Sequence, residues 1–254
     1  MNNKFDDFNI SKAHLSDVIR DNNITRKRTR QRHYPITRYG KPINYKKELS
    51  IFYKITDKYS IHKIICIDET SINAHMPSSY SRCELGKRCV YRTTDNKVFK
   101  KFTLVCAIMS KGVIGWILYE NGGMTADRMN EFISQFINNK FKKCLIIMDN
   151  GGPHKRKDIR TTIEDNGNYL QYSVPYRPKT NAIESWFNQF KYYYKINDDS
   201  TTFNQLKTKV KKSIKKINKQ SYENYMKYAY KNKEIRKFEP KNSTRRKSLK
   251  NYKK

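Results

Sequence analysis

Three acidic residues, Asp68, Asp149 and Glu184, are the ones in this sequence best suited to hold a divalent metal ion. Asp68 ends the apolar run 64–67, and Asp149 ends the apolar run 145–148. A charge at the end of an apolar strand costs desolvation energy unless a positive charge meets it. In an α/β sheet, ligands collect where the carboxyl ends of the strands meet. Two carboxylates there repel each other, and hard oxygen ligands favour Mg²⁺ or Mn²⁺ between them.

Glu184 supplies the third carboxylate, within the segment PYRPKTNAIESWFNQFK. The loop 175–178 ends a predicted strand, and Asn181 can cap the helix that follows. Glu184 then lies in the first helical turn, close to an apolar face that includes Trp186. Three such carboxylates could hold two metal ions ~3.5–4 Å apart, which would activate an attacking oxygen and stabilise a leaving one. The chemistry expected is phosphoryl transfer.

Each acid also has a simpler structural explanation when it is taken alone. An aspartate after a strand, such as Asp68, is most often a turn or helix cap. Asp149 is followed by Asn150 and two glycines, which is typical turn chemistry. Glu184 in a first helical turn stabilises the helix dipole. Only the joint context favours a metal site.

That context resembles the mariner superfamily of cut-and-paste DNA transposases and its bacterial insertion-sequence relatives. The motifs ICIDET, IIMDNGGPH and PYRPKTNAIESWFNQFK match the family's D-D-E triad, with 34 residues between Asp149 and Glu184. The resemblance covers roughly residues 45–230. Further matching positions are Asn150, His154, Tyr176, Pro178, Asn181, Ile183, Trp186 and Lys191.

The resemblance implies an RNase H-like α/β fold, in which a mixed central sheet is flanked by helices. Asp68 would lie on the central first strand, Asp149 at the end of the adjacent fourth strand and Glu184 on the following helix. The implied enzyme is a DDE transposase that hydrolyses DNA at the element's ends. The freed 3′-hydroxyl then attacks a target strand. The implied cofactor is two Mg²⁺ or Mn²⁺ ions, and the implied partners are double-stranded DNA and a second copy in a homodimer.

Three residues next to the triad are expected to support it: Asn150, His154 and Asn181. For His154, a capped loop histidine and a role near the metals remain equally open. Glu69 follows Asp68 on a strand and therefore points to the opposite face, so we expect it to be structural.

The sequence also departs from the family pattern. Val174, Arg177 and Ala182 stand where the family usually has proline, serine and proline. Arg177 would add a phosphate contact, as would Lys191. Family members usually carry two helix-turn-helix units before the core, and only the final helix of one is expected here.

Charge points to the same class of partner. The chain carries 54 Lys+Arg against 23 Asp+Glu, a formal charge of +31, and the usual polyanion for such a protein is nucleic acid. A helix capped by Ser11 precedes a basic run predicted to bind DNA, although an ordinary helix beside a solvated charge run would look alike. The basic residues are Arg26, Lys27, Arg28, Arg30 and Arg32.

Four segments are expected along the chain. Residues 1–35 hold a partial helix-turn-helix and basic arm, and 36–62 a linker with one helix. Residues 63–195 form the catalytic core, and 196–254 a basic helix and tail. Strands are predicted at 63–68, 101–109, 113–119 and 143–148, a hairpin joins the second and third, and a helix follows Thr125.

Other classes of protein are disfavoured. No apolar run reaches the ~18–20 residues needed to span a bilayer and no signal peptide opens the chain, so no membrane partner and an intracellular, DNA-associated location are expected. Five cysteines without a CxxC pair indicate reduced thiols and no zinc. Two alternatives to a transposase remain: a catalytically idle DNA-binding remnant, and a nuclease on the same fold.

Overall fold

The computed structural model describes residues 10–22, 35, 37–38, 40–74, 76, 100–138, 140–196 and 202–237. It consists of two compact units, residues 1–41 and 42–254. The predicted basic arm (Arg26, Lys27, Arg28, Arg30 and Arg32), Cys83, Cys89 and the tail from Pro240 lie outside the described residues. Within the described part, no helix has the length and apolar character required to cross a bilayer.

The second unit is built on a mixed five-stranded sheet in the order β5-β4-β3-β6-β7. The central strand β3 (Ile64–Asn73) pairs antiparallel with β4 (Lys101–Met109), which pairs antiparallel with β5 (Gly112–Tyr119). On its other side β3 pairs parallel with β6 (Leu145–Met148), and β6 with β7 (Tyr169–Tyr172). The expected class of fold, a mixed sheet flanked by helices, is confirmed.

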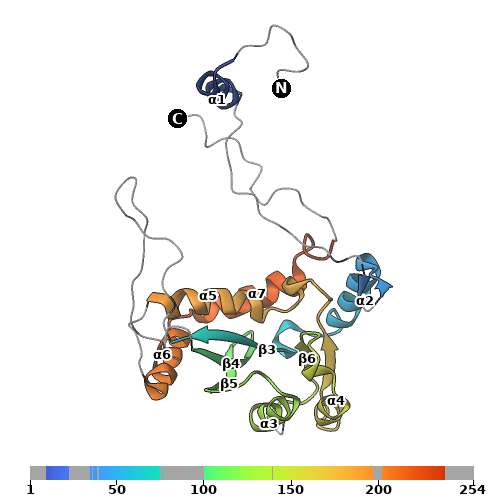
Figure 1. The fold of residues 1–254 in the computed structure, drawn as a ribbon. Coiled ribbons are helices and arrows are strands. Elements are labelled where there is room, and N and C mark those ends of the chain that lie inside the picture. Colours follow the sequence, from blue (N-terminus) through green and yellow to red (C-terminus); the bar gives the residue numbers. More distant parts are fainter. Residues whose placement is uncertain are drawn as a thin grey trace. The chain divides into compact units, whose positions relative to one another are not determined.

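In the described part of the second unit, α-helices pack around the sheet (Figure 1). They are α2 (Tyr45–Thr56), α3 (Ala126–Phe136), α4 (Lys157–Glu164), α5 (Ile183–Ile196), α6 (Phe203–Lys215) and α7 (Lys219–Lys231). The described residues also include the short 3₁₀ helices η1 (Ile61–Lys63), η3 (Pro153–Lys155) and η4 (Pro178–Thr180).

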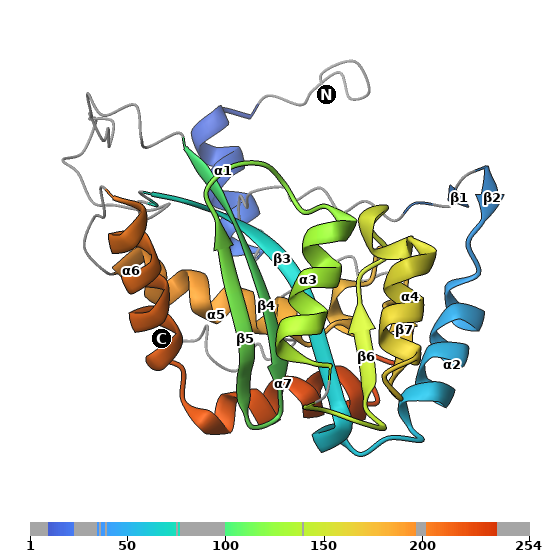
Figure 2. The same cartoon turned by 90° about the horizontal axis from the view of Figure 1, so that it is seen from below.

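The helices lie on both faces of the sheet because β3 is apolar on both faces (Figures 1 and 2). Ile64 and Cys66 belong to a core with α2, α5, α6 and α7, whereas Ile65 and Ile67 belong to a second core with α3 and α4. Successive residues of β3 therefore face different cores. Asp68 continues the first series and Glu69 the second.

Gly115 permits a close approach between a helix and the sheet. A Cβ built on Gly115 of β5 would lie 2.2 Å from Cδ1 of Phe136, the last residue of α3. Without that atom, the Phe136 ring rests directly on the strand backbone. The residue type at position 115 thus sets the position of α3.

Most predicted elements are present. Strand β4 has the predicted bounds, the hairpin to β5 is formed, and α3 begins after Thr125, whose side chain accepts a hydrogen bond from the Arg128 N–H. The predicted helix at Phe203 is α6. The helix α7 that follows it was not predicted, and it buries Tyr222 and Tyr230.

One expectation about β3 is wrong. Asp68 does not end the strand, which continues to Asn73. The cause is its antiparallel partner β4, which pairs with β3 from Cys66–Ile108 through to Asn73–Lys101. The parallel pairing with β6 ends at Cys66–Ile147, so Asp68 lies just beyond the last residue pair of that ladder.

The first unit contains α1 (Lys12–Asp21), which Ser11 caps by accepting a hydrogen bond from the His14 N–H at 3.1 Å. The predicted cap is therefore confirmed. No residue of α1 is buried, so its apolar positions have no core within the described residues. The short strands β1 (Thr37–Arg38) and β2 (Lys41–Pro42) pair with each other.

Candidate active site

Asp68 is the most buried acid of the predicted triad, with 7% of its surface exposed. Its Oδ1 accepts a hydrogen bond from the Glu69 N–H at 2.8 Å, and Asn181 Nδ2 lies 3.4 Å from its Oδ2. Burial raises the pKa of Asp68 to about 8, helped by the negative charges of Asp149, Glu69 and Glu184 and opposed by the hydrogen bond from the Glu69 N–H. Asp68 therefore sits among acids whose like charge disfavours its ionisation.

Asp149 follows β6 directly, and the loop after it folds back on its carboxylate. The Gly151 N–H donates to Asp149 Oδ1 at 2.9 Å, and the ring nitrogen Nδ1 of His154 bonds to the same oxygen. A Cβ built on Gly151 would lie 3.0 Å from that oxygen and 3.4 Å from His154 Nδ1. Glycine at position 151 thus leaves room for the contact between the two side chains.

His154 is fully buried and lies between two acids. Its Nε2 is 3.2 Å from Glu69 Oε2, and its Nδ1 contacts Asp149. The Nε2 contact is an ion pair and not an aligned hydrogen bond, because neither atom has a partner in hydrogen-bond geometry. Burial alone would lower the pKa of His154, but its close contacts with the negative charges of Asp149 and Glu69 raise it to about 10. The Tyr172 hydroxyl donates to the His154 carbonyl at 2.9 Å and holds the turn from behind.

Glu184 lies in the first turn of α5, as expected, and is partly buried. Burial raises its pKa, the charge of Lys191 lowers it, and the charge of Asp149 raises it. Lys191 lies two turns further along the same helix and interacts with Glu184 by charge. The structure therefore brings Glu184 within electrostatic reach of both aspartates.

The aromatic side of α5 anchors this acid. Trp186 and Phe190 stack with ring centroids 5.1 Å apart, and both are fully buried. The Trp186 indole N–H donates to the Tyr222 hydroxyl of α7 at 3.2 Å. The expectation that Trp186 lies on the apolar face of the helix is confirmed.

The expected cap of α5 is wrong. The Asn181 amide points away from the helix, with Nδ2 near Asp68 Oδ2 and 3.5 Å from the Ile67 carbonyl oxygen. Its Oδ1 is buried without a hydrogen-bond partner. Asn181 therefore contacts the catalytic candidate and not the helix terminus.

The other supporting candidates lie as follows. The Asn150 amide donates to the Ser173 carbonyl, which ties the loop after β6 to the end of β7. The Arg177 guanidinium contacts the carbonyl oxygens of Ile235 and Lys237 at 3.3 and 3.4 Å. In this arrangement Arg177 supports the segment after α7.

Ala182, where the family pattern has proline, makes a backbone contact that proline could not make. Its N–H donates to the Tyr230 hydroxyl at 3.3 Å, and that hydroxyl is 3.0 Å from Cys66 Sγ. The phenol of α7 thus joins the start of α5 to the strand that carries Asp68.

The donor set fits a hard divalent cation. The candidates are carboxylate oxygens, Asp68 lies within β3 and Asp149 directly follows the adjacent β6, and the charge of Asp149 helps to raise the pKa of Asp68. Among the described residues, no three His, Cys, Asp or Glu side chains are grouped tightly enough to enclose one ion.

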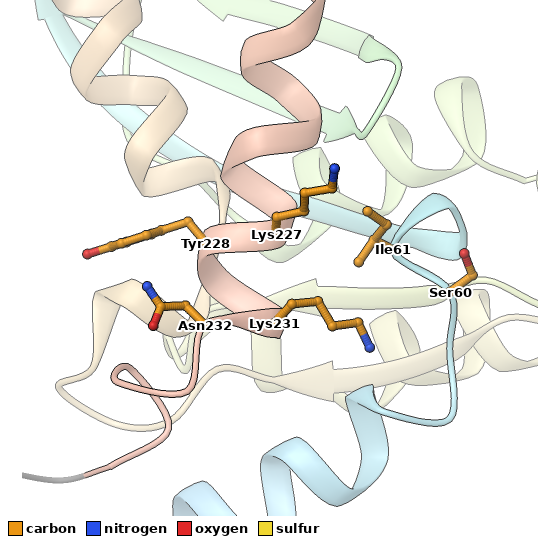
Figure 3. A pocket seen from close by; sticks show the side chains of 6 residues that line it. All are labelled: Ser60, Ile61, Lys227, Tyr228, Lys231 and Asn232. Atoms are coloured by element: carbon orange, nitrogen blue, oxygen red, sulfur yellow. The ribbon is translucent and has the colours of Figure 1, made fainter.

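Two described hollows lie away from these acids. The first, of about 560 Å³, is lined by residues of α7 and of the turn before β3 (Figure 3). In Figure 3, Lys227 and Lys231 extend toward the turn that carries Ser60 and Ile61, and Tyr228 points to the other side. The second, of about 590 Å³, lies between α2 and the segment after α7. The candidate site is identified by its residues and not by these hollows.

Residues 63–216, more than half of the chain, match the model of a family described as DDE superfamily endonuclease. The chain belongs to this family. The expectation drawn from its motifs is thereby confirmed, and the match spans all three acids of the triad. No curated protein matches the sequence of this DDE endonuclease at a significant level.

Solved structures of the Mos1 mariner transposase share the fold. The Mos1 paired-end complex with the left transposon end has a TM-score of 0.72 at 16% identity, covering 87% of this chain and 68% of that chain. The Mos1 paired-end complex with Mn has a TM-score of 0.70 at the same identity and coverage. The Mos1 catalytic domain has a TM-score of 0.56 at 14% identity, covering 74% of this chain and 87% of that chain. These likenesses confirm the RNase H-like fold.

Glu69 is the residue at the site whose contact the sequence did not reveal. Strand alternation places it opposite Asp68, and that part of the expectation is met. Its carboxylate nevertheless contacts Nε2 of His154, and Nδ1 of the same ring contacts Asp149. The available signal was the acidic pair Asp68-Glu69, but only the fold places a histidine from another loop beside the second acid.

Proposed function

We propose that this DDE endonuclease is a transposase that cleaves DNA at the ends of a mobile element and joins the freed 3′ ends to target DNA. The observation that carries the proposal is the acid cluster at the end of β6, where burial and like charge raise the pKa of Asp68 to about 8. Such a cluster is costly without a function, and it stands within the matched endonuclease segment.

Asp68 and Asp149 would hold divalent Mg²⁺ or Mn²⁺, with Glu184 completing the donor set around two ions. Bound metal would supply Lewis-acid stabilisation of the phosphate and of the attacking oxygen. Asn181 fixes Asp68 from the side of α5, and His154 and Gly151 fix the Asp149 carboxylate. Mos1 structures are described with Mn and with Mg, which supports the same metals here.

The proposed partner is double-stranded DNA, as element end and as target. The formal charge of +31 supports it, because each neutralised phosphate releases a counterion. Mos1 is described in paired-end and strand-transfer complexes, which supports a homodimer that holds two DNA ends. The proposed location is intracellular and associated with DNA.

The test uses the full chain with a plasmid that carries the DNA flanking its own gene. We expect nicking or double-strand cleavage in Mg²⁺ or Mn²⁺, none in EDTA, and loss of activity in Asp149→Asn. Asp165→Asn, an exposed residue at the end of α4, is the matched control and should behave as the wild type.

A second measurement separates transposition from simple cleavage. A labelled DNA end with a free 3′-hydroxyl is incubated with an unrelated target plasmid and the same metals. Joined products support a transposase, and cut ends that never join indicate a nuclease on the same fold. Tight, salt-sensitive DNA binding without cleavage at any metal concentration would contradict the proposal and indicate a DNA-binding remnant.

A further inference from the structure

Glu69 and Asp149 contact the two nitrogens of one buried imidazole. His154 is 1% exposed, its Nδ1 contacts Asp149 Oδ1, and its Nε2 lies 3.2 Å from Glu69 Oε2. A ring held at both nitrogens cannot rotate without losing one contact. The position of the Asp149 carboxylate is therefore tied to that of Glu69.

The contact reaches Asp149 from the side of the sheet that Asp68 does not occupy. Glu69 extends the series of Ile65 and Ile67, which faces α3 and α4. Asp68 extends the opposite series and meets Asn181 before α5. Glu69 thus stands behind the acids, where it can support a ligand without being one.

Asp149 needs such support because it lies on a loop and not on a strand. Its side chain is 46% exposed, compared with 1% for that of His154. The Gly151 N–H and His154 Nδ1 both bond to Oδ1, and together they restrict the rotation of the carboxylate. The imidazole of His154 in turn contacts Glu69 of the central strand β3, and the His154 carbonyl accepts from Tyr172 of β7.

We propose that Glu69 is a positioning residue, which acts through His154 to hold the Asp149 carboxylate in the direction that a divalent cation requires. This rests on the proposed function only in taking Asp149 as a metal ligand. Outer residues that orient a ligand typically contribute about 10–100-fold to metal affinity. An aspartate that lies on a loop and has a half-exposed side chain should depend on such a residue strongly.

The test measures Mn²⁺ binding to the full chain without DNA, by loss of the free-ion signal in electron paramagnetic resonance. Glu69→Gln keeps the size of the side chain and removes its charge, and should weaken Mn²⁺ binding about 10-fold or more. Glu69→Asp, which keeps the charge on a shorter stem, should restore part of the loss. Glu131→Gln, an exposed residue of α3, is the matched control and should bind as the wild type.

A double-variant cycle separates positioning from direct ligation. If Glu69 acts through His154, then Glu69→Gln should change Mn²⁺ binding less than about 2-fold when His154→Gln is already present. An undiminished loss in that background would overturn the inference, because Glu69 would then contact the ion itself or act by charge alone. Unchanged binding in the Glu69→Gln single variant would also overturn it, as would a wild type that binds no Mn²⁺.

Two further measurements keep the outcome clear. Thermal unfolding of the metal-free variants shows whether each has folded. If His154→Gln does not fold, the Mn²⁺ affinities of Glu69→Gln, Glu69→Asp and Glu131→Gln decide the question alone. A loss of Mn²⁺ affinity in Glu69→Gln that Glu69→Asp does not partly restore would count against the inference. Plasmid nicking by the wild type is measured in parallel. A wild type that binds Mn²⁺ but does not cut DNA would contradict the proposed function. The role of Glu69 would still be decided by the Mn²⁺ affinities of its variants.

Discussion

Replacing Asp68 by asparagine should make the metal-free protein more stable, although it should remove the activity. Asp68 is buried among acids that raise its pKa from the usual 3.8 to about 8. Asparagine has the same size, carries no charge, and keeps an oxygen that can accept from the Glu69 N–H. The substitution therefore removes the repulsion and retains the packing.

The magnitude and its pH dependence follow from the shift. A carboxyl whose folded pKa is raised favours the folded state fully below pH ~4, and this contribution is lost as the pH rises toward ~8. Each pKa unit corresponds to about 1.4 kcal/mol, so a shift of about four units sets an upper limit near 6 kcal/mol. Allowing for relaxation of the site, we expect Asp68→Asn to gain ~2–4 kcal/mol at pH 8 and little at pH 4. For a chain of this size the gain at pH 8 corresponds to a Tm rise of roughly 5–15 °C.

Urea unfolding in EDTA, followed by circular dichroism from pH 5 to 9, measures this difference at constant ionic strength. Asp165→Asn serves as the control for loss of one exposed charge. Added Mn²⁺ should offset most of this difference, since a ligand at about 100 times its Kd stabilises the wild type by ~2.7 kcal/mol. A stability difference that stays constant from pH 5 to pH 9, or a variant less stable than the wild type at pH 8, would refute the reasoning.

Three further predictions use neighbouring features of the structure. Gly151→Ala places a Cβ 3.0 Å from Asp149 Oδ1 and should weaken Mn²⁺ binding several-fold in a titration, whereas Gly152→Ala meets nothing within 4 Å and should not. Gly115→Ala presses on the Phe136 ring and should lower the free energy of unfolding by ~1–3 kcal/mol, with Gly123→Ala near neutral in the same urea experiment. DNA affinity, measured by fluorescence anisotropy, should fall on the order of 10³-fold between about 50 and 200 mM salt, and a flat dependence would contradict broad phosphate contact.

The parts of the fold that could be predicted are those in which local pattern and tertiary environment agree. Strand β4 is apolar along most of its length and is stopped by Lys111-Gly112, so both of its ends could be read. The helix after Thr125 has its apolar residues on one face, and Met129 and Phe132 are fully buried there. In these segments the local pattern of apolar residues is sufficient to predict the strand or helix.

The features that could not be predicted depend on partners distant in sequence. Asp68 looked like a strand end because the apolar run stops there, but pairing with β4 carries the strand onward to Asn73. Asn181 has the residue type of a helix cap, yet its amide turns to an acid more than a hundred residues earlier. Helix α7 buries Tyr222, Met226 and Tyr230 at helical spacing, but lysines and tyrosines between them concealed the pattern.

The candidate site also combines features that the local sequence predicts with features that depend on distant residues. The identity of the three acids follows from their motifs, because residue type and spacing are properties of the sequence. The contact from Glu69 to His154 does not, since it joins a strand to a loop 85 residues later and depends on how the turn after β6 closes. The acids that could hold a metal ion were therefore predicted from local motifs, whereas the contacts that position them could be found only in the folded structure.

The hydrogen bond from the Ala182 N–H to the Tyr230 hydroxyl has an evolutionary consequence. A chain with proline at position 182 has no N–H to offer there, so a phenol at position 230 would lose one of its partners in a buried place. Phenylalanine at 230 would then cost less than it does beside alanine. The two positions lie 48 residues apart, yet substitutions at them should be correlated among relatives, and an alanine gained at 182 should precede or accompany a tyrosine at 230.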